Sequence, residues 1–86
     1  MKQFDYTIKN SMGICTHSAG MLAKLVKGYS DTVVMVTKGG ETAKTSQLMK
    51  LVTMGVKQGD ALVVTAEGPE ESKAIVAVRA FFEKNL

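Results

Sequence analysis

The sequence of 86 residues has little of several residue types: one cysteine, one histidine, one proline and no tryptophan. A single cysteine cannot form a disulfide within the chain, so no feature points to an oxidising compartment. No segment approaches the ~20 apolar residues that a membrane-spanning helix needs, and the N-terminus alternates polar and apolar residues instead of forming a signal-like run. We therefore expect, by default, a cytoplasmic protein without membrane insertion.

Arginine and aromatic residues are scarce as well. Arg79 is the only arginine, aromatic residues make up 6%, and no cluster of lysines is interleaved with aromatics. We therefore do not expect nucleic-acid binding. The net charge of +3 is nevertheless uneven, because residues 1–50 carry +4 and residues 51–86 carry −1. An acidic partner or a phosphate would be drawn to the N-terminal half.

The length predicts one domain over residues 1–86. A chain this small buries only about 60% of the surface that its unfolded form exposes, which leaves room for one core layer. We therefore expect any chemistry at a surface loop or at a helix end.

Periodicity predicts the first elements. Apolar and polar residues alternate from Phe4 to Ile8, which is typical of a half-buried strand. Helical spacing of apolar residues predicts a helix over 16–27, and Gly28 is expected to end it with a positive φ. Two further strands, over 32–37 and 41–44, are joined by the hairpin signal Gly39-Gly40.

The rest of the chain predicts a short helix over 46–55 that ends at Gly55, a strand over 60–66, and a last helix with Pro69 at its first position. The order is β-α-β-β-α-β-α. It fits an α+β fold with a four-stranded antiparallel sheet and three helices on one face. A ferredoxin-like domain would share most of this pattern.

The stretch "GICTHSA", residues 13–19, places Cys15 and His17 at the start of the first helix. A helix N-terminus presents unpaired N–H groups and a partial positive charge, which together favour an anion. We expect Thr16 and Ser18 to cap the helix and the amides from His17 to Gly20 to face a phosphate. The same field lowers the pKa of a cysteine at this position and favours its thiolate.

Several interpretations of the pair remain open on the residues alone. A metal site is not expected, because Cys15 and His17 supply two ligands at most. A cysteine hydrolase would need a third, orienting group and a cleft. A redox-sensing thiol is possible, although the chain has no resolving cysteine. In the simplest interpretation, Cys15 is a small, partly buried apolar residue and His17 is solvated.

Three blocks of sequence resemble the HPr family, the histidine phosphocarrier proteins of the bacterial phosphoenolpyruvate:sugar phosphotransferase system. The blocks are "MGICTHSAGML", "LMKLVTMGVKQGD" and "VTAEGPEESKAIVAVRAFFE", and their order and spacing agree with the family. The resemblance implies an HPr-like open-faced β-sandwich. It also implies a carrier without cofactor, which takes a phosphoryl group from enzyme I and passes it to sugar-specific IIA domains.

The motif departs from the family at the positions that carry the chemistry. Cys15 stands where the family has its active-site histidine, His17 where it has an arginine, and Ser18 where it has a proline. The resemblance therefore assigns phosphate binding to Thr16, His17 and Ser18. The serine that HPr kinase phosphorylates in many relatives falls on Gln47, next to Ser46.

Three hypotheses follow from the resemblance. The protein carries a phosphoryl group on Cys15 or His17, or it regulates a partner without transfer, or it senses oxidants through Cys15. In each case we expect a monomer and not a turnover enzyme.

The resemblance also implies a surface for docking partners on the two shorter helices. It comprises Lys24, Lys27, Leu48, Met49, Lys50 and Val52. The alternative is ordinary, because Leu48 and Val52 would also suit the core and scattered lysines are usually just solvated.

Overall fold

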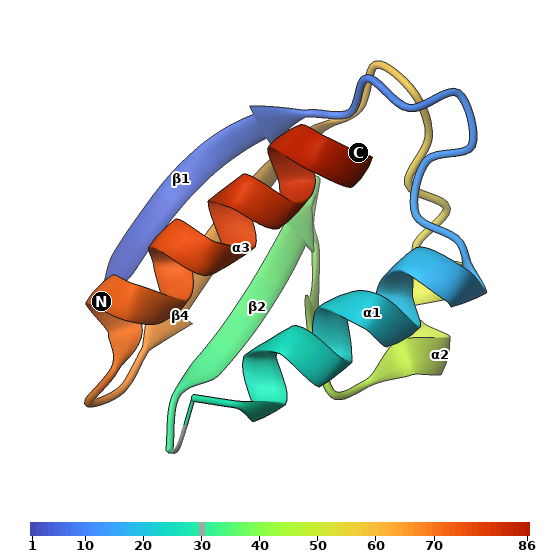
Figure 1. Cartoon of the computed structure of the whole chain (residues 1–86). Helices are drawn as coiled ribbons and strands as arrows, with labels where there is room; N and C mark the ends of the chain where they lie inside the picture. The colour runs from blue at the N-terminus through green and yellow to red at the C-terminus, as the bar shows by residue number, and fades with distance from the viewer. Residues whose placement is uncertain (30) are drawn as a thin grey trace.

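The computed structural model describes residues 1–29 and 31–86. Within them the chain forms four strands and three helices in the predicted order (Figure 1): β1 (Lys2–Thr7), α1 (Thr16–Lys27), β2 (Val33–Lys38), β3 (Glu41–Lys44), α2 (Leu48–Thr53), β4 (Ala61–Glu67) and α3 (Glu71–Asn85). None of these helices has the length and apolar character needed to span a bilayer.

The four strands form one antiparallel sheet in the order β1-β4-β2-β3. The three helices lie on one face of this sheet, and the other face is open (Figure 1). The α+β class and the open-faced arrangement that the sequence predicts are therefore confirmed.

The core lies between the sheet and the helices. Successive side chains of a strand point to opposite faces, so Phe4, Val64 and Val36 align across three strands on the inner face and are buried. Phe82 of α3 is fully buried against them, edge-on to Phe4 at 5.8 Å and to Tyr6 at 5.3 Å between ring centroids. The Tyr6 hydroxyl donates a hydrogen bond to the Phe82 carbonyl at 3.0 Å, which ties β1 to the end of α3.

The predicted hairpin is confirmed, whereas the predicted end of the first helix is wrong in detail. Gly39 has φ +59° in a two-residue loop between the paired Lys38 and Glu41. Gly28 follows α1 but keeps φ −75°, because its N–H still bonds to the Leu25 carbonyl in a helical turn. Asp31, three residues after Gly28, has left-handed backbone at φ +55°.

The starts of α2 and α3 also differ from the expectation. Pro69 lies before the helix, because α3 begins at Glu71, after a turn in which the Glu71 N–H bonds to the Gly68 carbonyl. The second helix is shorter than 46–55, because Gln47 folds back on Lys44: its N–H bonds to the Lys44 carbonyl, and its side chain accepts the Lys44 N–H. Residues 45–47 therefore form a turn, and α2 begins at Leu48.

Candidate functional site

The loop that leads to Cys15 is seated against the loop between α2 and β4. The Ile14 N–H donates to the Val56 carbonyl at 3.2 Å, and the Gly59 N–H donates to the Ile8 carbonyl at 2.8 Å. Gly13 has φ +63°, and a Cβ at this residue would lie 2.0 Å from the Val56 carbonyl oxygen. Only glycine allows this close approach, so the conformation of the loop before Cys15 depends on residue 13.

Cys15 is the N-cap of α1, with extended backbone at φ −118° and ψ 177°. The hydroxyl of Ser18, three residues on, accepts the Cys15 N–H at 3.0 Å and lies 3.2 Å from the Cys15 carbonyl. Ser18 is buried, whereas Thr16 is an exposed first residue of the helix. The expectation that Thr16 and Ser18 cap the helix is therefore corrected: the cap is Cys15, and Ser18 supports it from the third helical position, as in a capping box.

The pKa of the Cys15 thiol is held below the ordinary value for a cysteine. The main cause is the backbone N–H of Ser18, followed by the Ser18 hydroxyl, which lies 3.7 Å from the sulfur, and by the His17 N–H. The side chain is half-buried, so solvent and a reactant reach the sulfur. This arrangement favours the thiolate, which is the nucleophilic form of cysteine.

His17 is exposed two residues after the cap, and its backbone N–H is one of the groups that stabilise the Cys15 thiolate. The expected row of outward amides from His17 to Gly20 is shorter than predicted. The Ala19 N–H already bonds to the Cys15 carbonyl at 2.9 Å, as the first hydrogen bond of the helix. The amides of His17 and Ser18 are therefore the ones directed at the sulfur.

No group of three or more His, Cys, Asp or Glu side chains gathers within residues 1–29 and 31–86 in a way that could hold a metal ion.

The residues predicted for partner docking lie on the exposed sides of α1 and α2. Met49 is 75% exposed and Leu48 38% exposed, so Leu48 is not the core residue that the alternative interpretation supposed. The fully buried residue of α2 is Leu51. Val52 is half-buried, and the three lysines are exposed: Lys24, Lys27 and Lys50.

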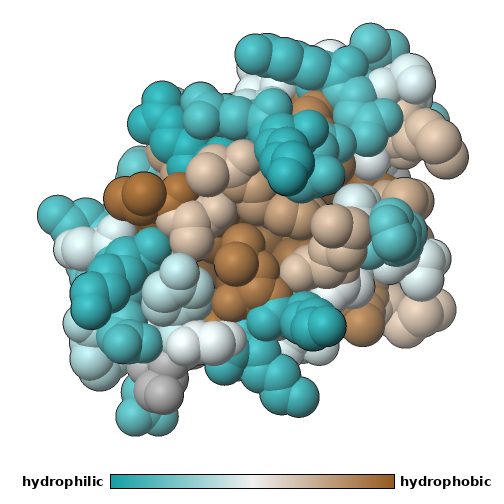
Figure 2. All heavy atoms as spheres, in the orientation of Figure 1, coloured by the Kyte–Doolittle hydropathy of each residue, from teal (hydrophilic) through white to brown (hydrophobic). Residues whose placement is uncertain are grey.

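Sequence reasoning missed two apolar residues beside this surface. Met12, in the loop before Cys15, is 73% exposed, and Met21 of α1 is 41% exposed. Figure 2 shows apolar colours on the side of the molecule where α1 and α2 lie, bordered by hydrophilic atoms. The sequence signal was available: Met21 lies four residues after His17, which places the two on neighbouring turns of the same helix face.

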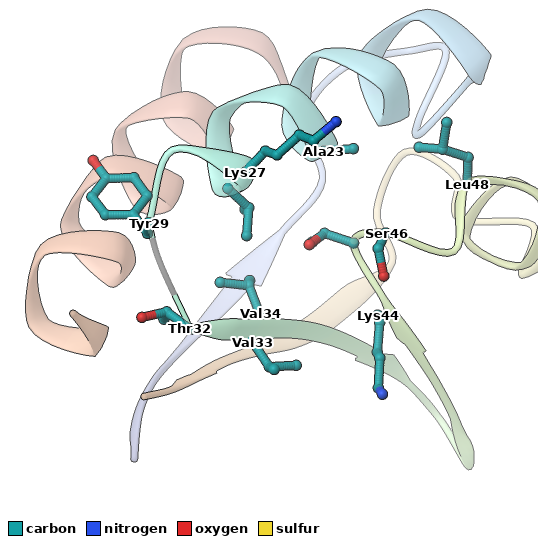
Figure 3. A pocket seen from close by; sticks show the side chains of 11 residues that line it. Ala23, Lys27, Tyr29, Thr32, Val33, Val34, Lys44, Ser46 and Leu48 are labelled. Carbon is teal, nitrogen blue, oxygen red and sulfur yellow. The ribbon is translucent and has the colours of Figure 1, made fainter. Parts of the chain in front are cut away.

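The region of the predicted regulatory serine borders a groove of about 440 Å³ between α1, β2 and the start of α2 (Figure 3). Ser46 is exposed at the edge of this groove, whereas its neighbour Thr45 is 3% exposed. Gln47 is the N-cap of α2 and has no hydroxyl. Ser46 is therefore the accessible hydroxyl of this turn.

Comparison with known proteins adds a further observation. Residues 2–84 match the family model described as "PTS HPr component phosphorylation site". The chain is 35% identical to the phosphocarrier protein HPr of Haemophilus influenzae over 71 residues, which cover 83% of this chain and 82% of that protein. It is 28% identical to the phosphocarrier protein HPr of Mycoplasma genitalium over 85 residues, 99% of this chain and 97% of that protein. The crystal structure of HPr-C-His from Thermoanaerobacter tengcongensis superposes with a TM-score of 0.89 at 27% identity, covering 98% of this chain and 93% of that one.

Proposed function

The chain belongs to the HPr family of the phosphotransferase system, and we propose that it carries a phosphoryl group on Cys15. The observation that carries this proposal is the position of the sulfur: Cys15 caps α1, and the N–H groups of His17 and Ser18 are directed at it. Backbone amides at a helix N-terminus stabilise the negative charge of a thiolate, and they would do the same for a bound phosphoryl group.

The transfer is an exchange of one bond for another. The Cys15 thiolate attacks phosphorus, an S–P bond forms, and the bond between phosphorus and the donor breaks with its electron pair left on the donor. The lowered pKa of Cys15 raises the fraction of thiolate available for this attack. His17, when protonated, supplies positive charge beside the phosphoryl group, and the reverse exchange passes the group to the next carrier.

The partners that we propose are enzyme I as donor and sugar-specific IIA domains as acceptors. Leu48 and Met49 are exposed on α2, and exposed lysines lie on α2 and on the adjoining α1, so we infer a surface with apolar and cationic parts. Such a surface complements a partner with an apolar patch and acidic edges.

A regulatory role without transfer is the second candidate. It is supported by the docking surface, which is built from residues other than Cys15, and by the exposed hydroxyl of Ser46 at the edge of the groove. HPr kinase would be the modifying enzyme. A thiol sensor is the third, supported by the half-buried, low-pKa Cys15. Its disulfide would need a thiol from another molecule, since the sequence has one cysteine.

The deciding experiment is the intact mass of the protein after incubation with phosphoenolpyruvate and enzyme I, with samples kept at acid and alkaline pH. We expect the gain of one phosphoryl group, its loss in Cys15→Ser and its persistence in His17→Ala. The opposite pattern, with an acid-labile product, would move the acceptor to His17. No gain, with enzyme I shown to be active on an ordinary HPr, would refute the carrier function. Rapid formation of a sulfenate at Cys15 in mild peroxide would then favour the sensor.

A further inference from the structure

The loop between α2 and β4 brings a lysine close to the phosphoryl site. A Cβ built on Gly13 lies 2.9 Å from the Cα of Lys57, so the two backbones touch. Figure 1 shows this loop, in yellow and orange, running along the blue segment that leads into α1. Cys15 is only two residues beyond Gly13, a chain distance of at most about 7 Å.

The backbone of Lys57 is fixed by contacts on both sides. Its N–H donates to Oδ2 of Asp60 at 2.8 Å, and the same carboxylate oxygen lies 3.0 Å from the Lys38 ammonium. The next residue, Gln58, donates from its side chain to the Lys9 carbonyl at 3.1 Å. The backbone of Lys57 is therefore held beside the residues that lead to Cys15, and its ammonium lies at the end of a flexible, exposed side chain.

The negative charge of a phosphoryl group on Cys15 would be better balanced by a second cation beside His17. A phosphoryl group on Cys15 carries close to two negative charges. An imidazole is a cation only when protonated, whereas a lysine ammonium is charged throughout the neutral range. The carboxylate of Asp60, which also faces this loop, is paired with Lys38 at 3.0 Å. Its pKa is lowered mainly by the Lys57 N–H and then by Lys38, and the Lys57 ammonium makes the smallest contribution, so Lys38 is its principal counter-charge.

We propose that Lys57 is a phosphoryl-binding residue of this protein: its ammonium supplies, from the α2–β4 loop, a positive charge for the phosphoryl group on Cys15. This inference rests on the proposed function. It assigns a role to a residue outside the "GICTHSA" stretch, which the fold places beside the site through the Gly13–Val56 contact.

The first test needs neither a partner nor phosphate. The rates at which Cys15 reacts with iodoacetate, an anion, and with neutral iodoacetamide are compared at one pH. For Lys57→Gln we expect the ratio of the two rates to fall roughly twofold to fivefold, the range for one exposed charge. Lys57→Arg should keep the wild-type ratio, and so should Lys73→Gln on α3, the matched control. An unchanged ratio in Lys57→Gln would overturn the proposal.

The second test separates this inference from the proposed function. With phosphoenolpyruvate and enzyme I, we expect Lys57→Gln to accept the phosphoryl group about threefold to tenfold more slowly than wild type, and the difference to shrink as salt is raised. Wild type that gains no phosphoryl group overturns the proposed function and the role of Lys57 together. Wild type that gains it at a rate matched by Lys57→Gln overturns the role of Lys57 alone.

Discussion

Replacing Gly13 by alanine should show how far the candidate site depends on one backbone contact. Gly13 has φ +63°, and a Cβ there would lie 2.0 Å from the Val56 carbonyl oxygen. Carbon and oxygen need about 3 Å or more, so the loop before Cys15 and the α2–β4 loop would have to separate by about 1 Å.

The expected loss in the free energy of unfolding has three parts. The left-handed backbone costs a non-glycine residue roughly 1 kcal/mol. The separation breaks the bond from the Ile14 N–H to the Val56 carbonyl, 3.2 Å long, and the loss of a hydrogen bond costs about 1 kcal/mol. The displaced loop contacts add about 1 kcal/mol more, within the range of overpacking. We therefore expect Gly13→Ala to lower the free energy of unfolding by about 3 kcal/mol, a large part of the stability of a small domain.

Gly39→Ala is the matched control. Gly39 has nearly the same φ, +59°, but nothing lies within 4 Å of its Cβ position. This variant therefore has the backbone cost of roughly 1 kcal/mol without the steric contact. Urea unfolding followed by circular dichroism measures both variants. Equal losses of stability in the two would refute the argument that the Gly13–Val56 contact holds the site together.

Three other outcomes are expected. Phe82→Ala should destabilise the domain by about 3–5 kcal/mol in the same urea assay and Phe81→Ala by less, because Phe82 is fully buried among three aromatic rings and Phe81 only partly. Ser18→Ala should lower stability by about 1 kcal/mol through loss of the bond from the Cys15 N–H. It should also raise the pH midpoint of Cys15 alkylation in part only, because the Ser18 N–H, the main cause of the lowered thiol pKa, is kept and only the hydroxyl is lost. Because the folded pKa is depressed, the thiolate's contribution to stability is present above the unfolded pKa and is lost as pH falls through the folded one. Met49→Asp should weaken the affinity for enzyme I at least tenfold in calorimetric titration while the fold is kept, since Met49 is 75% exposed; unchanged affinity would exclude it from the docking surface.

Most of the fold was predictable from the sequence because its signals are local and agree with one another. The alternation from Phe4, the stripe that ends near Lys27 and the Gly39-Gly40 pair each predict one element, and each element is present. The errors lie at element ends. Gly28 and Pro69 are residues that can end or start a helix, but the chain around each closes a turn through backbone hydrogen bonds that no residue preference reveals.

The chemistry of the site was predictable only in part. The position of Cys15 at a helix start follows from the turn and the apolar periodicity, and so does the direction of its pKa shift. Ser18 was expected to cap the helix and does so, but from the third helical position, a detail that depends on the rotamer of its side chain. The Gly13–Val56 contact joins residues 43 positions apart, and a single sequence gives no sign of such a pairing.

The departures from the HPr motif at Cys15, His17 and Ser18 have one physical consequence in common. Under the proposed function, Cys15 in place of a histidine acceptor would change the reacting atom from nitrogen to sulfur, whose thiolate the amides of His17 and Ser18 stabilise. Those amides belong to the backbone of α1, so they survive any change of side chain that preserves the helix start. A cation carried on a side chain does not survive in this way and must come from another residue. If the phosphoryl group is retained, the charge balance of the site therefore rests on His17 and Lys57, and the double variant His17→Gln, Lys57→Gln should lose more of the transfer rate than either single variant. A double variant that transfers as fast as the slower single one would show that only one of the two residues contributes to the transfer rate.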